Sequence, residues 1–265
     1  MDLRTVDRTL ARVQQVSGLA FSSFSALHLG GHLLASFSFS LADTALFASR
    51  VFYQNPVVEP LVVGASLVVH IGSSLARVVI RTRNIKKLNS RLEKDKLENS
   101  AEKMERTNAA EEVVKKPAQT AAQRELQFHR LSGYVLTALV GVHVLATRIT
   151  PLKVLPDTSI IDLTFVTHSL RADWTAPLFY PYYIILGTAG IYHTAFGIQQ
   201  ALSSMKLMRK RVNPGTWTTA LLVSAGIMTL AILGIAGIFE DVPIPLASKW
   251  HDLTEVMPLV AMGKL

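Results

Sequence analysis

The chain has 265 residues, of which 49% are hydrophobic and 17% are charged, and its formal net charge is +8. The charged residues avoid long apolar windows, a pattern typical of membrane proteins and not of soluble helical ones. The absence of cysteine excludes thiolate-bound metals, iron–sulfur clusters, thioether-attached haem and disulfides. The basic segments contain no interleaved aromatic residues, so their charge indicates membrane topology and contact with lipids, and we expect no nucleic-acid partner.

Five apolar stretches are close to the roughly 20 residues that cross a bilayer. In chain order they cover residues 16–39, 57–80, 131–146, 175–198 and 217–239. The sequence therefore predicts an all-α membrane fold with five transmembrane helices. We divide the chain into a first two-helix repeat (1–81), a charged linker (82–128), a second two-helix repeat (129–203), and a fifth helix with a C-terminal tail (204–265).

The two halves of the chain repeat each other around four histidines. A histidine follows the serine of a Ser-Gly pair by eleven residues from Ser17 to His28 and from Ser132 to His143. A histidine follows a glycine by six residues from Gly64 to His70 and from Gly187 to His193. Two matches in the same chain order indicate duplication of a two-helix unit, which carries one histidine in each helix.

The loop charges predict the orientation of the five helices. The N-terminal arginines, the charged linker and the loop at residues 206–211 are basic and fall on one side of the membrane. The other side carries most of the acidic loop residues outside the linker. Basic loops prefer the cytosol or the mitochondrial matrix. We therefore expect the N-terminus and the linker to share a compartment and the tail after Glu240 to lie opposite.

Four histidines inside apolar helices predict a shared ligand, because ionisable residues in a membrane are costly. A neutral imidazole nitrogen is a good ligand for haem iron, and two imidazoles on facing helices close both axial positions. A pseudo-twofold axis along the membrane normal would pair His28 with His143 and His70 with His193. We expect haem b bound by these residues. The spacing does not decide whether the chain binds one haem or two.

Other residues receive subordinate roles. His32 lies one turn after His28, but its counterpart in the second repeat is Thr147, so we expect it to support His28. His129 and Arg130 stand at the basic-side mouth of the third stretch. At that position, we expect these residues to pair with a haem propionate or a quinone oxygen. The alternative is that they lie at the lipid interface without such a partner. His168 and His251 fall in polar segments, where we expect solvated side chains.

The run His129-Arg130-Leu131-Ser132-Gly133, followed by an apolar helix with His143, resembles the opening motif of the succinate dehydrogenase cytochrome b subunit. The five-span plan, with one ligand histidine in each of the first four spans, resembles the single-chain dihaem cytochrome b of some fumarate reductases. It is also similar to a fungal mitochondrial five-helix protein of this superfamily, an adaptor in lipid homeostasis. In the respiratory subunit a serine usually stands three residues before the His-Arg pair and helps to hold quinone. Here that position is Leu126, so we expect weak quinone binding.

These patterns lead to three functional hypotheses. In the first, the chain is a b-type haem-binding integral membrane protein of the inner or outer mitochondrial membrane. It would act as an adaptor in membrane or lipid homeostasis, with membrane lipids or a lipid-transfer protein as partners. In the second, it is the membrane anchor of a peripheral dehydrogenase and passes electrons to or from quinone. In the third, it is a structural membrane subunit. In none of the three do we expect the chain to be catalytic by itself.

Overall fold

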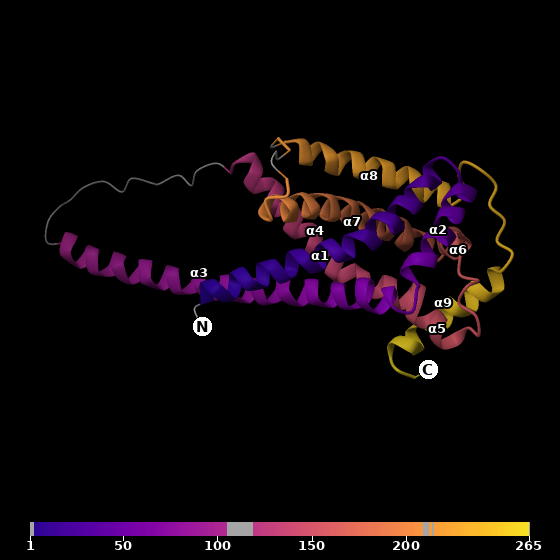
Figure 1. The fold of residues 1–265 in the computed structure, drawn as a ribbon, viewed down its shortest axis with the longest axis horizontal. Helices are drawn as coiled ribbons and strands as arrows, with labels where there is room; N and C mark the ends of the chain where they lie inside the picture. Colours follow the sequence, from indigo (N-terminus) through magenta and orange to yellow (C-terminus); the bar gives the residue numbers. More distant parts are fainter. Residues whose placement is uncertain (1–2, 105–118, 209–211, 214, 265) are drawn as a thin grey trace.

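The computed structural model describes residues 3–104, 119–208, 212–213 and 215–264, and every element within these residues is a helix (Figure 1). The α-helices are α1 (Leu3–Leu33), α2 (Phe39–Tyr53), α3 (Ser66–Met104), α4 (Ala121–Val144), α5 (Thr150–Val154), α6 (Leu163–Arg171), α7 (Ala176–Ser204), α8 (Thr216–Ile235) and α9 (Ala247–Ala261). A 3₁₀ turn follows α1 (Leu34–Ser36). One π-helical segment runs into α3 (Glu59–Ala65), and a second continues α4 (Leu145–Ile149).

Each predicted stretch corresponds to one long helix, but the ends differ. α4 begins ten residues before the predicted third stretch, at Ala121. It starts there because Thr120 and Gln123 form a capping box, in which each side chain accepts the other residue's backbone N–H at 3.3 and 2.9 Å. α3 continues to Met104, so the charged linker is helical at residues 82–104 and 121–128. Residues 105–118 of the linker and the basic residues 209–211 lie outside the described part of the chain.

Three helices in the described residues are long and apolar enough to cross a membrane. They span Glu59–Lys94, Ala121–Val154 and Thr216–Ile235. α1 and α7 fall short of that apolarity because histidines, serines and tyrosines interrupt their apolar residues. The all-helical fold is therefore confirmed, with three helices that could cross a membrane, whereas five transmembrane helices remain a prediction.

The histidine-bearing helices α1, α3, α4 and α7 form a bundle in which the two halves of the chain meet (Figure 1). α1 packs along α3, α4 packs along α7, and α1 also packs against α7, while α8 lies against α7. Within the described residues, α1 with α4 and α3 with α7 are not among the closely packed pairs, and neither are α3 and α4. The bundle therefore has two diagonals, α1–α4 and α3–α7, and one open side between α3 and α4.

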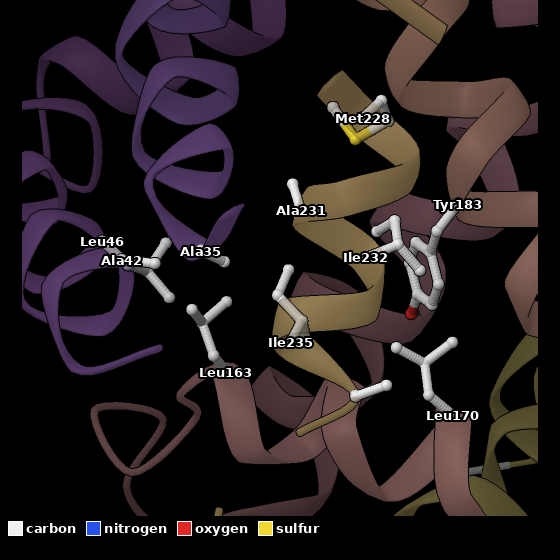
Figure 2. Packing of buried hydrophobic residues seen from close by; sticks show 11 residues of the cluster. Ala35, Ala42, Leu46, Leu163, Leu170, Tyr183, Met228, Ala231, Ile232 and Ile235 are labelled. Atoms are coloured by element: carbon white, nitrogen blue, oxygen red, sulfur yellow. The ribbon is translucent and has the colours of Figure 1, made fainter. Parts of the chain in front are cut away.

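The densest packing lies at the distal end of the bundle, which we define as the end formed by α2, α5, α6 and α9 (Figure 1). In Figure 2 the side chains of α8 lie between the α1–α2 corner and Tyr183 of α7. The buried cluster consists of Ala35, Ala42, Leu46, Leu163, Leu170, Tyr183, Met228, Ala231, Ile232, Ile235 and Ala236. The sequence did not predict α2, α6 or α9, which build and cover this end.

The C-terminal helix α9 is docked on α6 through one aromatic side chain. Trp250 is fully buried against Ile161, Phe165 and Leu253. Its indole Nε1–H donates to the hydroxyl of Thr164 at 3.0 Å, so the only polar atom of the ring is paired. The tail after α8 is therefore part of the folded distal end.

We predict that Trp250→Ala lowers the free energy of unfolding in detergent by about 3–5 kcal/mol, because it opens a cavity in this cluster. Thermal unfolding followed by circular dichroism measures the change. The matched control is Trp174→Ala, whose ring is 63% exposed and whose loss should change stability by less than about 0.5 kcal/mol. Equal effects of the two variants would contradict the docking of α9.

Candidate functional site

The structure brings the four histidines of the predicted repeat together as two pairs. The imidazole rings of His28 (α1) and His143 (α4) have their centres 5.9 Å apart. Those of His70 (α3) and His193 (α7) have their centres 6.1 Å apart. Each pair spans one diagonal of the bundle, so each joins one histidine from the first half of the chain to one from the second.

The two pairs lie at different levels along the bundle. Gly18 contacts the ring of His70 and Gly133 contacts the ring of His193, so that pair lies beside the first part of α1 and α4. Gly18 precedes His28 by ten residues, as Gly133 precedes His143, which is about 15 Å of helix at 1.5 Å per residue. The His28–His143 pair is therefore the distal pair, and we call His70–His193 the proximal pair.

The proximal histidines are held in the same way in both halves. The Nδ1–H of His70 donates to the backbone carbonyl of Gln14 at 2.9 Å, and that of His193 donates to the carbonyl of His129 at 3.1 Å. Gln14 and His129 each stand three residues before the serine of the Ser-Gly pair, so they are equivalent in the repeat. The glycine of that pair lies against the same ring, where a Cβ would approach to 2.9 Å in both halves.

These hydrogen bonds select the tautomer of the proximal histidines. A carbonyl oxygen only accepts, so Nδ1 must carry the proton, and the lone pair is left on Nε2. A metal-binding histidine is usually fixed in this way, with its second nitrogen donating to a carbonyl or carboxylate. The arrangement therefore has the chemistry expected of a ligand.

The distal histidines differ from the proximal ones, because their Nδ1 atoms make no hydrogen bond within the described residues. The Nδ1 atoms of His28 and His143 are buried and have no hydrogen-bond partner among the described residues. Leaving such an atom unpaired costs about 1–3 kcal/mol. As whole residues, all four histidines are partly buried, and none is exposed.

The separation of the rings fits two axial ligands of one metal ion. At a metal–nitrogen distance of about 2 Å, two imidazoles on opposite sides of an ion have ring centres about 6 Å apart. The described residues contain no group of three or more His, Cys, Asp or Glu side chains placed to hold a metal ion. A pair of imidazoles suits an ion whose remaining positions are filled by its own macrocycle, and haem is such a group.

The apolar windows of α3 and α4 are little covered by the rest of the described residues. Only 11% of the apolar window of each helix is buried, against 28% for the peripheral helix α8. A flat apolar group held across a diagonal would cover part of this surface.

A third histidine flanks each pair. The His32 ring lies 4.5 Å from the ring of His28 in an edge contact, and the His129 ring stacks on that of His193 at 4.2 Å. Both rings pack beside a predicted ligand. His129 therefore has two parts in the site: its carbonyl orients His193, and its ring covers that imidazole.

Arg130 is exposed on α4, and its charge acts on Arg81 of α3 beyond the proximal pair. Arg77 lies deeper and is already paired, since it donates to Asp7 at 3.0 Å and to the side chain of Gln14 at 2.5 Å. The cations at the proximal end therefore lie on α3 and α4, and Arg77 is paired with residues of α1. Among the site residues proposed from the sequence, Arg130 lies furthest toward that end.

The expectation that His168 and His251 lie in polar loop or tail segments was wrong, whereas His251 is solvent-exposed as expected. They belong to α6 and α9, and their rings lie 6.5 Å apart on the distal surface. His251 pairs with Glu255 one turn later at 3.2 Å. The prediction failed because both helices are short and amphipathic, so their polar residues resemble those of loops. Neither residue is near the histidine pairs of the bundle.

Sequence reasoning also missed an ion pair at the open side. The guanidinium of Arg148 donates through Nε and Nη2 to both carboxylate oxygens of Glu59, at 2.5 and 2.6 Å. Glu59 begins one π-helical segment and Arg148 lies in the other. Such segments are frequent at functional sites. The sequence did carry a signal for this pair. Glu59 and Arg148 are charged residues at the distal edges of the second and third apolar stretches, and Arg148 follows His143 by five residues.

Comparison with known protein families gives a match to part of the chain. Residues 138–240 are similar to the family described as MDM10-complementing protein 1, transmembrane domain. This region runs from the middle of α4 to the residues after α8 and contains His143 and His193. No curated protein and no solved structure matches the chain. The match and the three apolar helices point to a mitochondrial membrane protein.

We predict that Gly18→Ala and Gly133→Ala each displace the imidazole beside them and lower the free energy of unfolding by about 1–3 kcal/mol, because the added methyl group overpacks the contact. Thermal unfolding in detergent measures the loss. The control is Gly141→Ala on α4, where an added Cβ meets no atom within 4 Å. Equal stability of all three variants would contradict the close contact between glycine and imidazole.

Proposed function

We propose that this protein is an integral membrane protein of mitochondria that binds two b-type haems. The proximal haem would be held by His70 and His193 and the distal haem by His28 and His143. The observation that carries the proposal is the pairing of imidazoles across both diagonals, at ring separations of 5.9 and 6.1 Å. Support also comes from the five-helix, four-histidine plan that resembles the cytochrome b superfamily of succinate dehydrogenase and fumarate reductase.

The residues of the chain have separable roles in this proposal. Haem held by two imidazoles supplies reversible one-electron transfer and has no open axial position. The carbonyls of Gln14 and His129 hold the proximal imidazoles in the ligating tautomer. Gly18 and Gly133 allow those rings to lie against the neighbouring helix. His32 and His129 cover the outer faces of one ligand in each pair.

Single and double substitutions test the axial pairing. We predict that His28→Ala and His143→Ala lose the same haem, and that the double variant loses little more, because each change removes one of two ligands to one iron. His70→Ala and His193→Ala should form the second such set. Pyridine haemochrome quantitation per chain and reduced-minus-oxidised spectra measure the result.

Three other histidines serve as controls in that experiment. His32→Ala and His129→Ala should retain both haems with shifted spectra, since they flank ligands, and His251→Ala should behave as the unchanged protein. If the four ligand variants kept both haems, the imidazoles would be packing residues and the proposal would be wrong. Two separate sites would be supported if the unchanged protein held two haems per chain and each set of variants lost only one of them.

A second candidate function is electron transfer through the membrane, as in the anchor of a peripheral dehydrogenase. The observation that favours it is the separation of the two pairs by about 15 Å along both repeats, since sites at two levels can pass electrons between the two faces. The resemblance to the fungal lipid-homeostasis adaptor instead favours a role in membrane or lipid homeostasis. Copurified flavin and iron–sulfur subunits would support the respiratory role, and a copurified lipid-transfer protein would support the adaptor role.

The residue Arg130 tests for quinone chemistry. Because Leu126 replaces the expected serine, we predict weak quinone binding, and Arg130→Ala should weaken retention of the proximal haem more than it slows quinol-dependent haem reduction. The loss of one charge-assisted bond to a propionate would cost about 1.5–3 kcal/mol. Stopped-flow reduction by a quinol and haem quantitation provide the two readouts. Rapid reduction by quinol that Arg130→Ala abolishes without loss of haem would favour the respiratory role.

A further inference from the structure

Arg50, near the end of α2, has buried guanidinium nitrogens without acceptors. Its Nε and Nη1 atoms are buried and have no hydrogen-bond partner among the described residues. Its charged group lies over the ring of Phe47, 5.0 Å from the ring centre. The cation–π contact does not satisfy these two nitrogens, although the guanidinium is also hydrogen-bonded to the Tyr53 side chain. An arginine with buried unpaired N–H groups is expected to have an anionic partner.

Arg50 lies next to the distal histidine pair. Its charge acts on His28, His32 and Tyr53. The Tyr53 ring is 6.1 Å from that of His28 and makes an edge contact with Phe24 at 5.0 Å. α2 therefore turns back from the distal surface along α1 and carries Arg50 to the level of the distal pair.

A second cation belongs to the same neighbourhood. Arg148, in the π-helical segment that continues α4, is held by Glu59. The acidic groups nearby are already engaged. Glu59 accepts two bonds from Arg148, and Asp43 accepts the backbone N–H of Leu163 at 3.1 Å. None of the ion pairs formed by the described residues includes Arg50.

We propose that Arg50 forms an anion-binding site that takes a carboxylate of the porphyrin that His28 and His143 would hold. This inference rests on the proposed haem function. A porphyrin between these two rings carries its propionates at its edge, and a guanidinium is well suited to bind a carboxylate. The phosphate of an anionic lipid has the same chemistry and is the alternative occupant that the test distinguishes.

The test compares two forms of the ligand at the distal site alone. In a His70→Ala/His193→Ala background, the apoprotein is reconstituted in phosphatidylcholine nanodiscs with haem b or with its dimethyl ester, which lacks both carboxylate charges. Transfer to excess apomyoglobin measures the dissociation rate, and the Soret and α bands report bis-imidazole ligation. We expect haem b to dissociate about ten- to a hundredfold more slowly than the ester.

Substitution of Arg50 should remove that difference. In Arg50→Gln the dissociation rate of haem b should rise to that of the ester, while the rate of the ester should not change. Arg50→Lys should restore part of the difference because it keeps the charge. The matched control is Arg83→Gln, an exposed arginine of α3, which should leave both rates unchanged. If Arg50→Gln cannot be isolated folded, equal dissociation rates of haem and ester in the parent protein would overturn the proposal.

The remaining outcomes separate failure of this inference from failure of the haem proposal. A background protein that binds neither ligand with a bis-imidazole spectrum would refute the distal haem site itself. Bis-imidazole binding in which Arg50→Gln weakens haem and ester equally would leave the haem site standing and refute the carboxylate contact. An effect of Arg50→Gln on thermal stability that appears only when phosphatidylserine is added to the nanodiscs would assign Arg50 to a lipid phosphate.

Discussion

The hydrogen bond from a histidine Nδ1 to a carbonyl of the preceding long helix is the constraint on which the site depends. It is made by His70 to Gln14 and by His193 to His129, at equivalent positions of the two halves. The bond requires the two helices to approach closely, and the glycine one turn further along provides that approach. One local contact thus sets the helix spacing, the ring orientation and the tautomer.

The carbonyls of Gln14 and His129 make the same contact in the two halves, but the side chains of these two residues do not. In the second half, the His129 ring stacks on His193. In the first half, the Gln14 amide bonds to Ser74 and Arg77 instead of stacking on a histidine ring. The backbone interaction is therefore shared between the halves, while the side chains make the environments of His70 and His193 unequal. Two imidazoles with the same backbone contact in different surroundings provide a physical basis for distinct behaviour of the two halves.

The sequence predicted the parts of the fold that follow from periodicity and repetition. The spacing of Ser17 to His28 and of Ser132 to His143 placed these histidines on facing helices, and they do face each other. The helices α2, α6 and α9 could not be predicted in this way. They are short, and their apolar faces are defined by contacts with distant elements, as with Trp250 against Phe165. Arg50 was missed for the same reason, because its significance comes from the return of α2 along α1.

Both histidine pairs join residues that are equivalent in the repeat, which has a consequence for the origin of the fold. A residue that contacts its own counterpart lies on a twofold axis, as in an isologous homodimer. Neither two-helix unit contains a complete pair, so a separate unit would form these sites only by dimerising with a second copy. The chain has the architecture of such a homodimer joined end to end. The joining segment replaces a concentration-dependent encounter with an intramolecular one, and it allows the two copies to diverge, as Gln14 and His129 have done.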